Sequence, residues 1–203
     1  MASSQGEGAK MALMEHATAD ILEAGLDEIR RSPAEEGTVR LIVRRPAENK
    51  REVLREGTLD CAEGLVGDTW PTRHSASTGE GPHPDRQLTL MNARLAALVA
   101  GGDDRWQLAG DQLYVDFDLS EDNVPAGTRL AIGSAVIELT EKPHTGCKKF
   151  AGRFGNEALR FVNSPAGRKL RLRGANARIV VAGTVCTGDV IRKITPMAPR
   201  PPR

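Results

Sequence analysis

The chain has 203 residues, 39% hydrophobic and 27% charged, which suits one globular domain with an appended terminal element. Its 28 basic and 27 acidic side chains nearly cancel, which argues against nucleic acid or an anionic membrane as the partner and favours a small molecule. Cysteine occurs only at positions 61, 147 and 186, no apolar run is long enough to span a bilayer, and we expect no leader segment, so we predict a reduced, cytoplasmic protein.

The two ends of the chain differ from its body. Residues 1–9 are small and polar, and we expect them to be disordered. Apolar residues at helical spacing predict an amphipathic helix over residues 10–31, within an arm that spans residues 10–33. Such a stripe predicts burial without naming the partner surface, so packing on its own body and a homo-oligomer both stay open. Residues 196–203 predict a loose, proline-rich tail.

The next segments predict a hairpin, a long loop and a capped helix. Residues 38–46 and 51–60 are short and β-branched and flank the turn-like "AENK", which is typical of a hairpin. Glycine and proline then punctuate a region over residues 68–87 that we expect to be a functional loop near the site. Residues 88–91 predict a strand, and Asn92 is expected to cap a short helix that Gly101 and Gly102 end.

The remaining segments predict a strand-rich body. Residues 112–120, 128–133 and 135–143 predict three strands, residues 148–162 predict a helix, and residues 176–194 predict a strand, a glycine turn and a last strand. Many short strands, few helices and no strand–helix alternation predict a mostly β, α+β fold, a mixed β-barrel with helices at its ends. Phosphate-loop and dinucleotide-binding signatures do not occur in the sequence.

Cys147 is the main chemical candidate, in the stretch "EKPHTGCKKFAGRFG". Pro143 and Gly146 disfavour a helix before the cysteine, and Lys148 can begin one after it, which would place the thiol near a helix N-terminus. That position and adjacent cations favour a thiolate, a nucleophile or soft-metal ligand that His144 could assist. The alternative is an inert thiol, because free cysteine is among the most buried residue types.

Other candidates have weaker local support. His74 and His83 lie nine positions apart, without the close helical pairing of zinc motifs. Cys61 and Cys186 are expected to be packing or incidental surface thiols. A basic set either forms an anion pocket or is a solvated face. It consists of Lys148, Lys149, Arg153, Arg168, Arg171 and Arg173.

Four segments of the chain occur in a telling order: "GLVGD", "DNVPAGTRLAIGSAVIELT", "PHTGCKKFAGRFG" and "SPAGRKLRLRGANARIVVAGTVCTGDVI". In this order they resemble the MOSC domain, which is named for the C-terminal part of molybdenum cofactor sulfurases. The resemblance covers residues 38–195. It implies a barrel-like fold that binds the molybdenum cofactor (molybdopterin) through Cys147. It further implies a molybdenum-dependent reductase of N-hydroxylated small substrates, supplied with electrons by a separate protein. The alternative that it implies is a persulfide sulfur carrier or cofactor-delivery module, with a cysteine desulfurase as its partner.

The resemblance also suggests roles for single residues. Cys147 would be the metal ligand and, with His144, the catalytic group. Pyridoxal phosphate is not expected in this chain, which is too short to include the separate domain that carries it in fused sulfurases. A third hypothesis is that the barrel is a small-ligand binding domain or an interaction domain in which the Cys147 thiol is inert. If the chain binds the molybdenum cofactor, the residues that contact it would be Lys148, Lys149, Arg153, Arg171, Arg173, Asp122 and Asn123.

Overall fold

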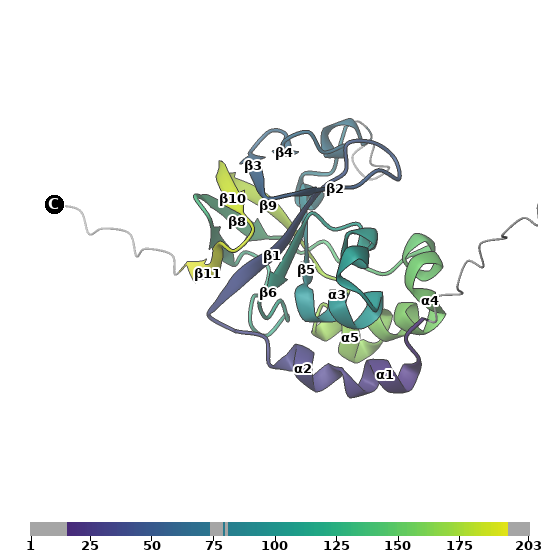
Figure 1. Ribbon diagram of the computed structural model, residues 1–203. Helices are drawn as coiled ribbons and strands as arrows, with labels where there is room; N and C mark the ends of the chain where they lie inside the picture. Colours follow the sequence, from purple (N-terminus) through teal and green to yellow (C-terminus); the bar gives the residue numbers. More distant parts are fainter. Residues whose placement is uncertain (1–15, 74–78, 80, 195–203) are drawn as a thin grey trace, which may run out of the picture.

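The computed structural model describes residues 16–73, 79 and 81–194 of the chain. Within these residues, seven strands close into a mixed barrel in the order β11-β7-β8-β9-β5-β6-β1, and β1 pairs with β11 to complete the ring. They are β1 (Glu36–Arg44), β5 (Leu88–Asn92), β6 (Leu113–Asp116), β7 (Arg129–Ile132), β8 (Ala135–Leu139), β9 (Ala175–Val181) and β11 (Val190–Ile194). Figure 1 shows the helices gathered on one side of the strands. The predicted fold class, a mostly β mixed barrel with short helices, is confirmed.

One pair in the ring, β5 with β6, is parallel, and the connection between these strands shows how local sequence builds the barrel. Parallel neighbours need a long crossover. Here α3 (Ala93–Ala100) and the 3-10 segment η3 (Asp103–Ala109) supply it. As predicted, Asn92 caps α3, and its side-chain oxygen accepts from the N–H groups of Arg94 and Leu95 at 2.9 and 3.2 Å. Gly101 ends the helix with φ 68°, a conformation that favours glycine.

The predicted N-terminal helix over residues 10–31 is two short helices in its described part, α1 (Ala19–Ala24) and α2 (Leu26–Arg30). Gly25 separates them, and a Cβ there would lie 2.6 Å from the end of the Leu98 side chain, so the arm approaches α3 closely at this residue. Leu22 and Ile29 are buried against the chain's own helices, which shows that this stripe packs on its own body. Residues 10–15 and the predicted tails, residues 1–9 and 196–203, lie outside the described residues.

The predicted helix at residues 148–162 is confirmed as α4 (Lys148–Asn163), but Gly155 divides it with φ 90° and ψ 165°. The second half therefore runs back toward the start of the first. Ser164 then caps α5 (Pro165–Lys169), and its hydroxyl accepts a hydrogen bond from the Gly167 N–H at 3.0 Å. In the part of the chain that the structure describes, no helix combines the length and hydropathy needed to cross a membrane.

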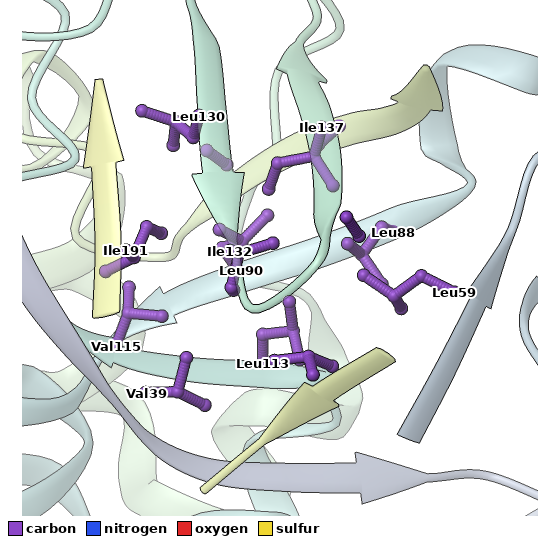
Figure 2. Packing of buried hydrophobic residues seen from close by; sticks show 14 of the residues in the cluster. Val39, Leu59, Leu88, Leu90, Leu113, Val115, Leu130, Ile132, Ile137 and Ile191 are labelled. Carbon is purple, nitrogen blue, oxygen red and sulfur yellow. The ribbon is translucent and has the colours of Figure 1, made fainter. Parts of the chain in front are cut away.

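Two hydrophobic clusters lie on the two sides of the barrel wall. The inner cluster fills the barrel, where side chains from facing strands point toward one another (Figure 2). The outer cluster lies between the wall and helices α1 to α4. Strand β5 contributes to both, because successive side chains of a strand alternate: Leu88 and Leu90 point inward and Met91 points outward. The whole strand is accordingly buried.

A second, smaller sheet corrects the predicted hairpin. β1 does pair with β2 (Glu52–Leu54) in antiparallel register, as expected for residues 38–46 and 51–60. After Leu54, however, the chain forms β3 (Glu56–Asp60), which pairs with β4 (Gly64–Leu65) and with β10 (Gly183–Cys186). Leu59 of β3 is fully buried in the inner cluster, and this burial draws the segment away from β1. Within the predicted glycine turn "GTVCTGD", the first four residues form β10, and the turn itself lies at Thr187 and Gly188, where Gly188 has φ 96°.

Candidate functional site

Cys147 lies at the N-cap of α4, with extended backbone angles and an exposed, free thiol. Its carbonyl accepts the first helical hydrogen bond from the Ala151 N–H at 3.0 Å, and its side chain makes no capping bond. The sequence predicted this placement from Pro143 and Gly146 before the cysteine. The thiol is therefore available to a ligand and is not used to hold the helix in place.

The turn at Gly155 has a direct effect on the backbone before the thiol. It brings Asn163, the last residue of α4, back to Gly146. The Gly146 N–H donates to the Asn163 side-chain oxygen at 2.9 Å, and the Asn163 amide donates to the Gly146 carbonyl at 3.2 Å. A Cβ at Gly146 would lie 2.7 Å from the Leu159 side chain, so the contact leaves no room for a larger residue. The segment that presents Cys147 is held at a defined position.

Cys147 opens onto a cavity of about 570 Å³ that is lined mainly by positive charge. The lining comes from segments far apart in the sequence: the end of β1, the turn before β2, the residue after η1 (Trp70–Thr72), the first turns of α4 and the residues before β9. Glu48 is the single carboxylate among its described lining residues, and it pairs with Lys149 at 3.3 Å. The cations of the lining are Arg45, Arg51, Arg73, Lys149, Arg153 and Arg173. We call this space the thiol cavity.

Two of these arginines are neutralised by buried carboxylates. Asp68 is fully buried and accepts two bonds from the Arg45 guanidinium, both at 2.8 Å. Asp111 is also fully buried and accepts from Arg173 at 2.6 Å. The Arg173 guanidinium lies 5.1 Å from the ring centre of Phe150 in the first turn of α4. Both pairs are fixed parts of the fold, because removing one partner would leave the other charge buried and unpaired.

Arg51 and Arg153, by contrast, have no carboxylate partner among the described residues. Arg51 donates to the Lys50 carbonyl at 2.6 Å, and Arg153 donates to the Leu108 carbonyl at 2.6 Å. Burial lowers the pKa of Arg51 below its ordinary value, and the charges of Arg153 and Arg45 lower it further. Its Nε is buried without a partner. Converging guanidiniums with free donors are typical of a site for phosphate or another oxyanion.

His144 lines the same cavity, three residues before Cys147. Its side chain is 19% exposed, and its Nδ1 lies 3.3 Å from the Asp111 carboxylate, without the geometry of a hydrogen bond. Burial lowers the pKa of His144 to about 3, and the charge of Arg173 adds to this, whereas Asp111 opposes it. The imidazole is therefore neutral near pH 7, so it can accept a hydrogen bond and does not add to the positive charge.

The structure brings some of the sequence-predicted residues to the thiol cavity and not others. Lys149, Arg153 and Arg173 line it with His144, whereas Lys148 is exposed outside the lining. Arg171 lines another cavity, of about 220 Å³, which shares His144 and Arg173 with the thiol cavity. Its guanidinium donates to the Val124 carbonyl at 2.6 Å. Burial lowers its pKa.

Asp122 and Asn123 lie outside both of these cavities. Asp122 pairs with Lys169 at 3.0 Å, and Asn123 donates to the Asp118 carbonyl at 2.7 Å and accepts from Lys193 at 2.9 Å. Through these contacts, the two side chains hold the turn at residues 121–123 against α5 and β11.

Several lining residues were missed by sequence reasoning. Arg45, Arg51 and Arg73 belong to no motif, and only the tertiary fold brings them to Cys147. Asp111 carries no local signal either. Of the histidines in the loop, His83 caps the 3-10 turn η2 (Pro84–Arg86) through the Asp85 N–H at 3.1 Å, and His74 lies outside the described residues. The Cys186 thiol donates a hydrogen bond to the Glu56 carboxylate at 3.4 Å, and Cys61 is exposed just after β3.

Comparison with known proteins gives one family match and several similar folds. The profile of the MOSC domain matches residues 83–192. The YuaD protein from Bacillus subtilis superposes with a TM-score of 0.57 at 16% identity, covering 77% of this chain and 94% of that one. YiiM from Escherichia coli superposes with a TM-score of 0.51 at 18% identity, covering 80% of this chain and 72% of that one. No curated protein matches the sequence.

Proposed function

Because the chain belongs to the MOSC domain family, which is associated with molybdenum cofactor binding, we propose that it holds this cofactor through the Cys147 thiolate. We further propose that the holoprotein is a molybdenum-dependent reductase of N-hydroxylated small substrates. The observation that carries the proposal is an exposed thiol that makes no capping bond and opens onto a cavity with two guanidiniums, those of Arg51 and Arg153, that have no carboxylate partner in the described part of the chain.

The residues present fit the cofactor in size and chemistry. A thiolate is the soft ligand that such a metal centre takes from a protein. The cofactor's phosphate matches Arg51 and Arg153, whose guanidiniums have no carboxylate partner among the described residues. The buried, unpartnered Nε atoms of Arg51 and Arg173 are further donors for it. A volume of about 570 Å³ lies in the range of small-molecule sites.

In this proposal each residue has a defined task, and the cofactor, when bound, supplies a two-electron redox centre. The Asn163–Gly146 contact holds Cys147 in position, which limits the freedom lost on binding. His144, neutral near pH 7, accepts a hydrogen bond from the ligand and orients it. Among the described residues, no group of three or more His, Cys, Asp or Glu side chains could hold a metal, so Cys147 would share the metal with ligands from the cofactor.

Partners and compartment follow from the same proposal. A reductase of this kind would receive its electrons from a separate donor protein. All three cysteines are free, which suits the reducing cytoplasm that we propose as its location.

One observation favours a second function, that of a persulfide sulfur carrier. The Cys147 thiol is exposed and lies at a helix N-terminus beside cations, which is the environment of transferable sulfur. A cysteine desulfurase would be its partner, and the cofactor would be delivered to another protein. Intact-mass analysis would show one additional sulfur atom on Cys147 in this case.

Elemental analysis of protein from a host that makes the cofactor tests the main proposal. We expect near-stoichiometric molybdenum in the wild type and in the control Cys61→Ser, which removes another exposed thiol, and none in Cys147→Ser. Protein without molybdenum in all three samples would reject cofactor binding. Molybdenum that survives Cys147→Ser would reject Cys147 as the ligand.

A further inference from the structure

A further hollow, of about 240 Å³, adjoins the thiol cavity and is distinct from the cavity at Arg171; we call it the second hollow. The two spaces share Arg45, Arg73 and His144 in their linings, so a ligand in the first can extend into the second. Buried polar side chains contribute to the lining of the second hollow, with Asn176 2% and Thr89 9% exposed. An apolar ligand group would be a poor match for such a lining.

The described lining of the second hollow carries a net positive charge. Arg73 and Arg86 line it, and among the described residues neither lies within ion-pair distance of a carboxylate. Arg73 donates to the Thr69 hydroxyl at 3.2 Å. No carboxylate belongs to its described lining. Arg45 is already neutralised by Asp68, and His144 is neutral. Within residues 16–73 and 81–194, the charges of Arg73 and Arg86 therefore remain for a ligand.

The electrostatic surroundings show that these cations act on one another. The pKa of Arg73 lies below its ordinary value, mainly because protein surrounds part of the side chain and next because Arg45 is near. The charge of Arg86 also contributes to the low pKa of His144. Such a gathering costs folding free energy, which an anion bound in the hollow would recover.

We propose that the second hollow is a subsite for a phosphate monoester group on the substrate, bound by Arg73 and Arg86. Two unpaired charges match a phosphate monoester, which carries a charge of about −1.5 to −2 near pH 7, whereas a carboxylate would compensate only one. The shared wall at Arg45 and His144 would let the rest of the substrate reach Cys147. The assignment of the phosphate group to a substrate rests on the proposed function, whereas the anion subsite itself does not.

Isothermal titration calorimetry with inorganic phosphate, on cofactor-free protein at low ionic strength, tests this proposal. We expect two phosphates to bind the wild type, one in each space. Arg73→Gln/Arg86→Gln should remove one event or weaken it by about tenfold or more. Because Arg73 lines both spaces, Arg86→Gln alone, at a residue that lines only the second hollow, should weaken the same event and leave the other unchanged. The matched control Arg51→Gln/Arg153→Gln should remove the other, and Arg73→Lys/Arg86→Lys, which keeps both charges, should retain both events.

The outcomes separate this proposal from the cofactor site. An isotherm unchanged by Arg73→Gln/Arg86→Gln would overturn the subsite, and so would a single event that only the control pair removes. A single event that both double variants weaken would mean one shared site and would also overturn it. A single event lost only in Arg73→Gln/Arg86→Gln would support the subsite and count against the cofactor phosphate site.

A second titration tests the assignment to substrate. Phenyl phosphate should compete with inorganic phosphate for the event that depends on Arg73 and Arg86, and phenol should not. If phenyl phosphate fails to enter, the subsite takes only a free inorganic anion and the substrate assignment is wrong.

Discussion

Asn163 hydrogen-bonds both backbone polar groups of Gly146, at 2.9 Å to its N–H and 3.2 Å to its carbonyl, although the two residues stand at opposite ends of α4 and the loop before it. The turn at Gly155 makes this possible. A contact between the end of a helix and the residue before its start closes a short loop around Cys147.

We expect Asn163→Ala to lower the free energy of unfolding by about 1–2 kcal/mol, because two partly buried backbone groups lose their partner. It should also change the rate at which iodoacetamide alkylates Cys147, since the thiol loses its fixed position. The exposed Asn156→Ala, on the same helix, is the control and should leave both values unchanged. Equal alkylation rates in all three proteins would show that the contact does not position the thiol.

Gly146→Ala should destabilise the protein by about 1–3 kcal/mol, because its Cβ would lie 2.7 Å from the Leu159 side chain and 3.0 Å from that of Val162. Gly152 is the matched control within α4. A Cβ there has no neighbour within 4 Å, so Gly152→Ala should stabilise the helix by about 0.5–1 kcal/mol. Urea unfolding measures both. Opposite signs are required, and two equal shifts would refute the steric argument.

His144 should make stability fall in mild acid. Burial lowers its pKa from 6.5 to about 3, so between these values the unfolded chain binds a proton that the folded chain refuses. The free energy of unfolding should then fall by up to about 1.4 kcal/mol per pH unit below about pH 6.5. Denaturant unfolding of wild type and His144→Gln measures this. The variant should lose less stability on acidification, and parallel pH profiles would contradict the prediction.

Asp111→Asn should cost about 3–5 kcal/mol of stability, because it leaves the Arg173 guanidinium buried beside a neutral amide. The Arg44–Glu52 pair provides the contrast, since its side chains are 35% and 45% exposed. Glu52→Gln should cost no more than about 1 kcal/mol. Thermal unfolding of both variants is the measurement. A loss for Asp111→Asn as small as that for Glu52→Gln would mean that the buried pair relaxes freely.

Several features could be predicted from the sequence because their causes lie within a few residues. Asn92 and Gly101 mark the ends of α3 through capping chemistry that does not depend on the rest of the chain. Pro143 and Gly146 before Cys147, and lysines after it, likewise predicted a cysteine at a helix start. Many short strands, few helices and no strand–helix alternation indicated the barrel, and the order of motifs indicated the family.

Other features depend on pairings between distant segments. The sequence of β3 suits pairing with β1 as well as with β10, and the burial of Leu59 inside the barrel decides between them. Similarly, the helical stripe of the N-terminal arm predicted burial, but only the folded chain shows that Leu22 lies in one buried cluster with side chains of α3 and α4 of the same molecule.

The sequence by itself therefore determined the family, the barrel class and the position of Cys147 at the start of a helix, since each follows from local backbone preference or from motif order. Only the tertiary structure decided what faces the thiol. Arg45, Arg51 and Arg73 meet it because strand pairing brings separate loops to one end of the barrel. The charge of a site depends on all the residues that surround it in the folded protein, and these residues can lie far apart along the chain.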